Sequence, residues 1–310
     1  MRILVTGACG FVGRHVLDEL MRAGHTPLAC DAVKPAAAHP LPVEVHTVDL
    51  RDAPALKKLV AELTPDACIH LAGIAFVPMG WIDPELVFSV NLLGTINLLQ
   101  AFHSAAATAR MLVVTSAEVY GRVPGTHPFS EDAPLTPDNL YAVSKMAADL
   151  SALLYARRYG VHIMTARPGN HIGPGQSSHF VTSAFAQQIV NIARKKADPV
   201  LKVGNLECER DFTDVRDVAH AYRLIIEGGH TGKAYNVSSE KLVKISVILD
   251  ELCRLAGVSP EIVVDPDLYR PLDARPRLDA SRVRKELGWE PRIGLSETLA
   301  DVLADIERQT

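Results

Sequence analysis

Short apolar, often β-branched runs alternate with longer amphipathic stretches through the first half of the chain. The short runs predict strands, and the longer stretches, whose apolar residues recur at helical spacing, predict helices. The predicted strands are Arg2–Thr6, Pro27–Asp31, Val43–Val48, Ala67–Leu71, Met111–Thr115 and Val161–Arg167. The predicted helices lie near 11–23, 53–63, 84–108 and 138–159. Because this alternation is typical of βαβ units, we expect a parallel sheet.

The pattern becomes less regular after Arg167. A loop rich in glycine and proline covers 167–176 and precedes a predicted helix near 178–196. A further helix and strand, Asp214–Glu227 and Ala234–Val237, are expected to return to the sheet and supply its seventh strand. The remaining helices are predicted near 244–257, 280–287 and 295–309.

These patterns predict an α/β fold with a doubly wound Rossmann sheet of about seven parallel strands and a smaller C-terminal α/β substrate-binding lobe. We expect the dinucleotide-binding domain to comprise 1–167 and about 213–240. The lobe should comprise about 168–212 and 241–310. Ligands of such folds bind beyond the carboxyl ends of the strands, so substrate should meet cofactor in the cleft between the two parts.

The composition is that of an ordinary globular protein, with 310 residues, 48% hydrophobic, 22% charged and a formal net charge of −4. The near-neutral balance argues against a nucleic-acid partner, which usually requires a basic face. No apolar run approaches the roughly 20 residues that span a bilayer, and the N-terminus lacks the pattern of a secretion signal. The cysteines and histidines are scattered, without the spacing of a disulfide framework or a metal site. We therefore expect a cytoplasmic protein without membrane association or bound metal.

The predicted helices near 84–108 and 138–159 are long and rich in alanine and leucine. A second apolar face on these helices would pair two subunits, so we expect a homodimer formed through them. A buried core helix would give the same pattern, and the sequence does not separate the two interpretations.

Three glycines, Gly7, Gly10 and Gly13, follow the first predicted strand and open the first helix in the spacing G-x-x-G-x-x-G. Glycine lets the backbone turn tightly and approach a pyrophosphate, which then rests on the N–H groups of the helix N-terminus. A tight turn with close helix–strand packing would use the same glycines. Their place between a strand and a helix favours a dinucleotide site.

Several strand ends add candidate cofactor contacts. Asp31 ends the second strand, where a carboxylate accepts hydrogen bonds from the adenosine ribose, and its charge would repel a 2′-phosphate. We therefore expect NAD(H), with NADP(H) left possible because Lys34 is near, although a solvated strand-end acid would look the same. Residues at the next two strand ends would contact the adenine and the nicotinamide ribose: Asp49, Leu50, Leu71, Ala72 and Gly73.

Tyr141 and Lys145 lie four residues apart on a predicted helix and therefore share one face. A free phenol ionises near pH 10, and we expect the ammonium of Lys145 and an oxidised nicotinamide to lower the pKa of Tyr141. Ser116 follows the fifth strand, where its hydroxyl would bind the same substrate oxygen as Tyr141. A Y-x-x-x-K spacing alone is common, but it is far less so after a glycine loop and a strand-end serine.

Taken together, these residues resemble the extended short-chain dehydrogenase/reductase family over essentially the whole chain. The resembling segments are the glycine loop, Asn91–Thr95, Thr115–Gly121, Tyr141–Lys145 and Arg210–Val218. The resemblance implies a nucleotide-diphosphate sugar in the cleft, with hydride exchanged at its C4 and the proton handled by Tyr141. It also implies cofactor contacts from Phe11, Val12, Asn91, Thr115, Tyr141, Lys145 and Arg167.

Within that family, the segment from Arg167 to Gln176 with Phe180 and Val181 resembles GDP-4-keto-6-deoxy-D-mannose reductases, which make GDP-D-rhamnose. The resemblance implies a set of substrate contacts: Ser116, Glu118, Asn170, Phe180, Val203, Arg210, Arg270 and Asp273. Arginine suits the nucleotide end, because its fork binds phosphate oxygens in pairs. Read without the resemblance, Arg210 and Arg270 would be ordinary surface charges.

Three positions depart from the usual family pattern. Gly169 stands where a bulkier residue is usual, which would enlarge the sugar pocket, and Glu240 replaces a common glycine. Glu118 occupies the place of the base that related 4,6-dehydratases use, although Ala117 replaces an aspartate that some of them carry. Reduction of a nucleotide 4-keto-6-deoxyhexose is the favoured reaction. An NAD-dependent 4-epimerase, a 4,6-dehydratase using Glu118 and a non-catalytic dinucleotide sensor are the alternatives.

Overall fold

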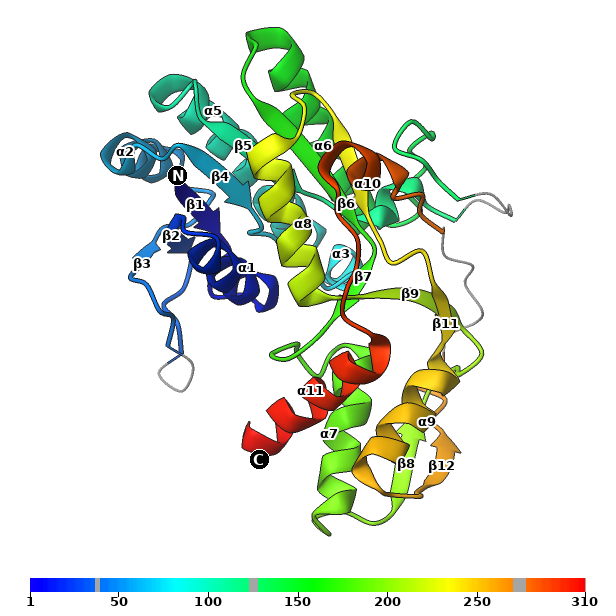
Figure 1. The fold of residues 1–310 in the computed structure, drawn as a ribbon. Coiled ribbons are helices and arrows are strands. Elements are labelled where there is room, and N and C mark those ends of the chain that lie inside the picture. Colours follow the sequence, from blue (N-terminus) through cyan, green and yellow to red (C-terminus); the bar gives the residue numbers. More distant parts are fainter. Residues whose placement is uncertain (37–39, 123–127, 270–276, 310) are drawn as a thin grey trace.

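The computed structural model describes residues 1–36, 40–122, 128–269 and 277–309. Its centre is a parallel sheet of seven strands in the order β10-β6-β5-β4-β1-β2-β3 (Figure 1). The strands are β1 (Arg2–Thr6), β2 (Thr26–Asp31), β3 (Val45–Thr47), β4 (Ala67–His70), β5 (Arg110–Val114), β6 (Ile163–Pro168) and β10 (Ala234–Val237). The predicted Rossmann sheet is confirmed, including the return of β10 as the seventh strand.

Helices cover both faces of this sheet because alternate strand residues point in opposite directions. Ile3 and Val5 of β1 pack with α1 (Phe11–Arg22) and α8 (Val215–Gly228) in one apolar core. Leu4, between them, packs in a second core on the other face. The helices of that second face are α2 (Ala53–Leu63), α5 (Thr95–Ala105) and α6 (Leu140–Tyr159).

The long helix predicted near 84–108 is divided into pieces. Its parts are α4 (Pro84–Phe88), the π-helical η1 (Ser89–Gly94) and α5, and the short α3 (Met79–Ile82) precedes them. By length and mean hydropathy the stretch Pro84–Ala105 could span a membrane, and 44% of its most apolar window is buried. The expectation that no apolar run reaches that length was therefore wrong. Since α5 packs against α2 and α6, a core helix accounts for the same pattern.

The smaller lobe lies below the Rossmann domain in Figure 1 and contains α7 (Val181–Ala193), α9 (Ile245–Ala256) and α11 (Leu295–Gln309). Its strands are short: β7 (Asn170–Ile172), β9 (Glu209–Asp214) and β11 (Leu242–Lys244) form one sheet, and β8 (Val200–Val203) pairs with β12 (Glu261–Val264). The sequence predicted only a loop over 167–176, because a three-residue strand is too short to show an alternating pattern.

Helix α10 (Ser281–Leu287) corrects the expected division of the chain. It packs against α8 and β10, and Val283 and Trp289 join the same core as β1. The expectation that 241–310 belongs wholly to the lobe is therefore wrong around α10. Glu240 has a left-handed φ of 61° and connects β10 to this helix, because its carboxylate accepts a hydrogen bond from the Ala280 N–H at 2.7 Å.

Candidate active site

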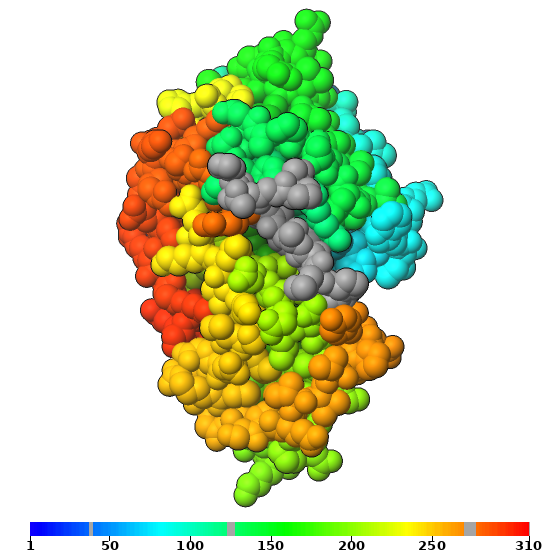
Figure 2. All heavy atoms as spheres, turned by 90° about the vertical axis from the view of Figure 1, so that its right-hand side faces the viewer, coloured from blue at the N-terminus to red at the C-terminus, as the bar shows by residue number. Residues whose placement is uncertain are grey.

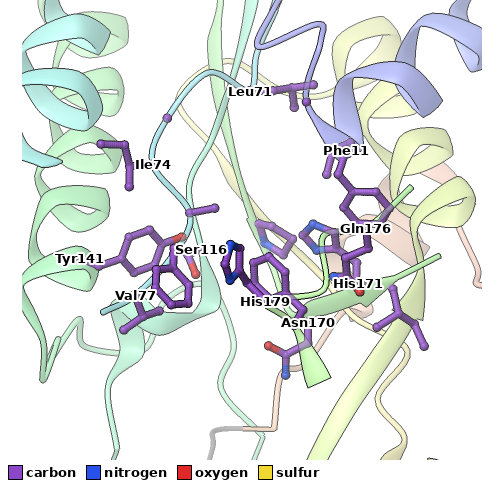
Figure 3. A pocket seen from close by; sticks show the side chains of 18 of the residues that line it. Phe11, Leu71, Ile74, Val77, Ser116, Tyr141, Asn170, His171, Gln176 and His179 are labelled. Carbon is purple, nitrogen blue, oxygen red and sulfur yellow. Dashed lines mark hydrogen bonds between the residues drawn. The ribbon is translucent and has the colours of Figure 1, made fainter. Parts of the chain in front are cut away.

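A cavity of about 1240 Å³ lies between the Rossmann sheet and the lobe. Its walls include the loops that follow β1, β2, β4 and β5, and the segment from β6 to α7 forms much of the opposite side. Figure 3 shows Tyr141 and Ser116 on one side of this cavity and Phe11 and His171 on the other. The cleft expected beyond the carboxyl ends of the strands is thus present.

The glycine loop forms the part of the cavity wall that fits a dinucleotide. Gly7 has a φ of 73°, and a Cβ there would lie 2.7 Å from the backbone nitrogen of Ala72. A Cβ on Gly13 would lie 2.2 Å from the carbonyl oxygen of Gly7. Gly10 caps the N-terminus of α1, whose first N–H groups have no helical partner. The loop therefore brings bare backbone to a helix N-terminus, as a bound pyrophosphate requires.

The adenosine end of the cavity is bordered by Asp31 and Asp49. The Asp31 carboxylate accepts a hydrogen bond from the Cys9 N–H at 2.9 Å, which ties the glycine loop to the end of β2. Asp49 pairs with Arg51 through Nη2 at 2.6 Å, and this hydrogen bond lowers the pKa of the Asp49 carboxyl. Arg51, which was not selected from the sequence, also borders the cavity. Its proximity to Asp49 places a cation beside the expected adenosine site.

Helix α6 carries Tyr141 and Lys145 because Asn139 starts the helix just before them. The Asn139 side chain accepts a hydrogen bond from the Ala142 N–H at 2.8 Å, a typical N-cap. Tyr141 and Lys145 are both buried, with 6% and 7% of their surface exposed. The Ser116 hydroxyl at the end of β5 is a hydrogen-bond partner of the Tyr141 phenol, and Figure 3 shows both side chains on the same side of the cavity. The predicted phenol–hydroxyl pair is therefore assembled.

The pKa of Tyr141 differs from the expectation. Burial raises the pKa of Tyr141 to about 12; the hydrogen bond from Ser116 lowers it and the Glu118 carboxylate raises it further. Burial likewise lowers the pKa of Lys145 to about 8, and Lys145 donates to the carbonyl of Val114 at 3.4 Å. In the protein alone, loss of solvation outweighs the hydrogen bond from Ser116. The phenol is thus kept protonated at neutral pH.

Glu118 lines the cavity beside this pair. Its backbone N–H donates to the Ser116 hydroxyl at 3.2 Å, and one carboxylate oxygen lies 3.5 Å from the side-chain nitrogen of Asn139. The carboxylate that the sequence singled out is therefore close enough to Tyr141 to influence its pKa.

Four expected contact residues are buried and do not line the cavity: Asn91, Arg167, Val203 and Lys145, whose ammonium donates to the Val114 carbonyl. Asn91 holds the loop after β4, accepting from the Ile74 N–H at 2.8 Å and donating to the Ile74 carbonyl at 3.1 Å. Arg167 is bound to Asp149 at 2.6 Å, and Val203 lies in the core of the lobe. Their side chains are used within the protein, so these residues position the site without lining it. Arg270 and Asp273 lie outside the described residues.

Other expected residues do line the cavity, on the side of the lobe: Asn170, Phe180 and Arg210. Two histidines beside them were not identified from the sequence. His171 stacks on Phe11 of the glycine loop with ring centroids 6.0 Å apart, and His179 packs on Phe76 at 5.6 Å. Their positions next to Asn170 and Phe180 were the available signal. These ring contacts join the two parts of the protein across the cleft.

The remaining expected cofactor contacts also border the cavity. They come from the glycine loop and from the ends of the strands: Gly10, Phe11, Val12, Leu50, Leu71, Ala72, Gly73 and Thr115. Gly73 allows close approach, since a Cβ there would lie 3.0 Å from Nζ of Lys145. In the described part of the chain, no group of three or more His, Cys, Asp or Glu side chains is arranged to hold a metal ion.

Comparison with known proteins identifies the class to which this fold and site belong. The family model described as GDP-mannose 4,6 dehydratase matches residues 4–302, so the chain belongs to this family of extended short-chain dehydrogenases. It is an enzyme family that acts on nucleotide sugars with NAD(P).

Individual proteins and solved structures are similar to this chain over almost its whole length. GDP-6-deoxy-D-mannose reductase from Pseudomonas aeruginosa is 39% identical over 308 residues, which cover 99% of this chain and 97% of that protein. The solved structure of RMD from Pseudomonas aeruginosa, complexed with NADPH, has a TM-score of 0.89 at 37% identity and covers 100% and 99% of the two chains. UDP-glucose 4-epimerase from Thermus thermophilus, complexed with NAD, has a TM-score of 0.87 at 29% identity, with 99% of each chain covered.

Proposed function

We propose that this protein reduces the C4 ketone of a nucleotide-activated 4-keto-6-deoxyhexose, with a GDP-sugar as the favoured substrate and a GDP-D-rhamnose-type product. The observation that carries the proposal is the buried Tyr141 phenol, hydrogen-bonded to Ser116 and facing the cavity beside the glycine loop. The similarity to GDP-6-deoxy-D-mannose reductase supports the choice of substrate.

In this reaction the ketone oxygen accepts hydrogen bonds from Ser116 and Tyr141. NAD(P)H supplies the hydride that forms the new bond at C4, and Tyr141 donates the proton that completes the hydroxyl. A phenol whose pKa is raised to about 12 is protonated at neutral pH and therefore available as a donor. When Tyr141 becomes a phenolate, the buried ammonium of Lys145 on the same helical face stabilises the negative charge in place of water.

NAD(H) is the cofactor that Asp31 favours, since a carboxylate at the end of β2 accepts ribose hydroxyl bonds and repels a 2′-phosphate. Arg51 works in the other direction, because its guanidinium borders the same cavity and would attract a phosphate. We therefore propose NAD(H) as the preferred cofactor, with NADP(H) accepted. Measuring KM for NADH and NADPH with wild type and Arg51→Ala tests this, because the variant should lose affinity for NADPH selectively.

At the other end of the substrate, Asn170, Phe180 and Arg210 line the lobe side of the cavity. We propose that Arg210 binds the diphosphate and that the Phe180 segment borders the nucleotide. Phe180 is 38% exposed although it is apolar, as expected of a ring that a base would cover.

A second candidate reaction rests on Glu118. Its carboxylate lines the cavity next to Tyr141, where it would remove the C5 proton of a transient 4-keto sugar in a 4,6-dehydratase. A 4-epimerase is the third candidate, and it requires the keto sugar to rotate within the cavity so that its other face is reduced. The products distinguish all three, because dehydration removes one water from GDP-mannose and epimerisation leaves the mass and the redox state unchanged.

We also propose a homodimer, formed through the outer surface of α3, η1 and α6. Large apolar side chains are exposed there: Trp81, Ile82, Leu93, Leu150, Leu154 and Tyr159. Figure 2 shows the segment around α3, in cyan, standing out at the edge of the Rossmann domain. Exposed apolar patches of this kind mark interfaces. Sedimentation of wild type and Leu154→Glu tests the dimer.

We also propose a cytoplasmic location for this protein, because all five cysteines are free.

The deciding experiment offers the purified protein GDP-4-keto-6-deoxymannose with NADH or NADPH, then GDP-mannose and UDP-sugars in separate reactions. The proposal expects nicotinamide oxidation only with the keto sugar and a 6-deoxyhexose product by mass and NMR. Loss of water from GDP-mannose in the absence of the keto sugar would identify the protein as a dehydratase instead of a reductase. An isomeric product would identify it as an epimerase.

A further inference from the structure

Gly169 is a cavity-lining glycine that neither the backbone nor the packing requires. Its φ lies outside the left-handed region, and a Cβ at this position would meet nothing closer than 3.8 Å. By contrast, a Cβ on Gly7 or Gly13 would collide with backbone at 2.7 or 2.2 Å. Glycine in an extended segment costs conformational entropy on folding. Because no contact in the fold offsets that cost, we infer that the space left by the missing side chain serves ligand binding in the cavity.

The space next to Gly169 is a hollow with apolar walls. The Cδ1 atom of Leu278 would lie 3.8 Å from the added Cβ, and Leu278 belongs to the apolar cluster against which Ala117 packs. All three residues line the cavity. Ala117 directly follows Ser116, whose hydroxyl is bonded to the Tyr141 phenol. We call Gly169, Leu278 and Ala117 the Gly169 hollow, and it lines the same cavity as Ser116 and Tyr141.

The atoms nearest the Gly169 hollow are mostly apolar, because two of the three heavy atoms closest to the added Cβ are carbons. The only polar atom within 4 Å of the added Cβ among its three nearest neighbours is the carbonyl oxygen of Val237, which accepts the Gly169 N–H at 2.9 Å. The neighbouring Ser238 hydroxyl donates to Asp211. A ligand hydroxyl in the hollow would exchange its water for at most a second hydrogen bond to this carbonyl, whereas a methyl group would lose nothing and would pack against Leu278.

We propose that Gly169 is a specificity-determining residue, and that its hollow takes an apolar substituent on the sugar carbon next to the reacting carbonyl. In the 4-keto-6-deoxyhexose of the proposed function, on which this inference rests, that substituent is the methyl group on C5. The hollow then selects a 6-deoxy sugar over one with a hydroxymethyl group at the same carbon.

Equilibrium binding tests the hollow without depending on turnover. The ligands are a GDP-6-deoxyhexose, GDP-mannose and GDP alone, measured calorimetrically with the wild type, Gly169→Ala and Gly169→Val. The wild type should bind the 6-deoxy sugar nucleotide at least about tenfold more tightly than GDP-mannose. Gly169→Val should weaken binding of the 6-deoxy sugar nucleotide by about 10- to 200-fold, the range that a methylene-sized change gives in an apolar pocket. Gly169→Ala should fall between the two, and GDP and the cofactor should bind all three proteins within about twofold.

Gly169→Ser provides a matched variant, because it adds a hydroxyl with little bulk. It should improve the affinity for GDP-mannose relative to the 6-deoxy ligand and so reverse part of the selectivity, even if Gly169→Val proves unstable in a melting experiment. Equal affinity of wild type and Gly169→Val for the 6-deoxy ligand would overturn the inference, as would an equal loss for GDP. Selective binding without any oxidation of NAD(P)H by a keto sugar would leave the hollow in place and refute the reductase.

Discussion

Arg167 offers the sharpest test of whether a residue binds the cofactor or holds the site in place. Its guanidinium is 3% exposed and bonds to the Asp149 carboxylate at 2.6 and 3.2 Å, to the Tyr120 phenol at 3.0 Å and to the Glu131 carbonyl at 2.9 Å. Replacing Arg167 by methionine keeps most of the volume but leaves the Asp149 carboxylate buried without its cation. Loss of one partner of a buried pair costs about 3–5 kcal/mol.

For a chain of this size the loss corresponds to a Tm lowered by roughly 5–15 °C. Thermal unfolding followed by circular dichroism measures it, and fluorescence titration gives the affinity for NADH below the transition. We expect Arg167→Met to be destabilised by this amount while its affinity for NADH stays within about threefold of wild type.

A paired variant supplies the control. Arg167→Met combined with Asp149→Leu removes both charges, and such apolar replacement of a buried pair is often neutral or stabilising. The double variant should therefore recover most of the lost Tm. An unchanged Tm for Arg167→Met, together with a tenfold or greater loss of NADH affinity, would refute the positioning role and restore the cofactor contact expected from the sequence.

Three further predictions concern the residues around the site. Tyr141→Phe should lower kcat by about 10²- to 10⁴-fold, because the proton donor is lost, with NADH affinity nearly unchanged; normal turnover would exclude the assigned donor. Because the pKa of Lys145 is lowered to about 8 in the folded state, the unfolded chain binds the extra proton above that pH, so stability should rise from pH 8 towards 9.5 in wild type more than in Lys145→Met. Free energies of unfolding, measured with urea, that change equally with pH in the two proteins would contradict this prediction. Glu240→Ala should cost about 1–3 kcal/mol in urea unfolding, since the Ala280 N–H and the Arg284 guanidinium lose their acceptor at 2.7 and 2.8 Å; a neutral change would show that solvent replaces both bonds.

Much of the Rossmann domain was determined by local pattern. β1 needs a continuous apolar run because both of its faces are covered, and that run is visible in the sequence. Gly13 is dictated by contacts within the strand–loop–helix unit, and Gly7 by its positive φ together with the approach of Leu71 and Ala72; their spacing shows in the sequence alone. The spacing of Tyr141 and Lys145 on one helical face follows from helix geometry in the same way.

Tertiary structure decided what each polar side chain does with its hydrogen bonds. Asn91 and Arg167 occupy family positions next to the cofactor site, yet their partners come from the loop after β4 and from α6, distant segments that no local pattern specifies. The pKa of Tyr141 depends on burial by the assembled lobes, so its direction could not be derived from the nearby lysine. The free space beside Gly169 likewise exists only because Leu278, more than a hundred positions away in the chain, packs across from it. The sequence determines short-range geometry through backbone propensity, whereas the solvation of a side chain and the free volume beside it depend on which residues, distant in the chain, pack against it.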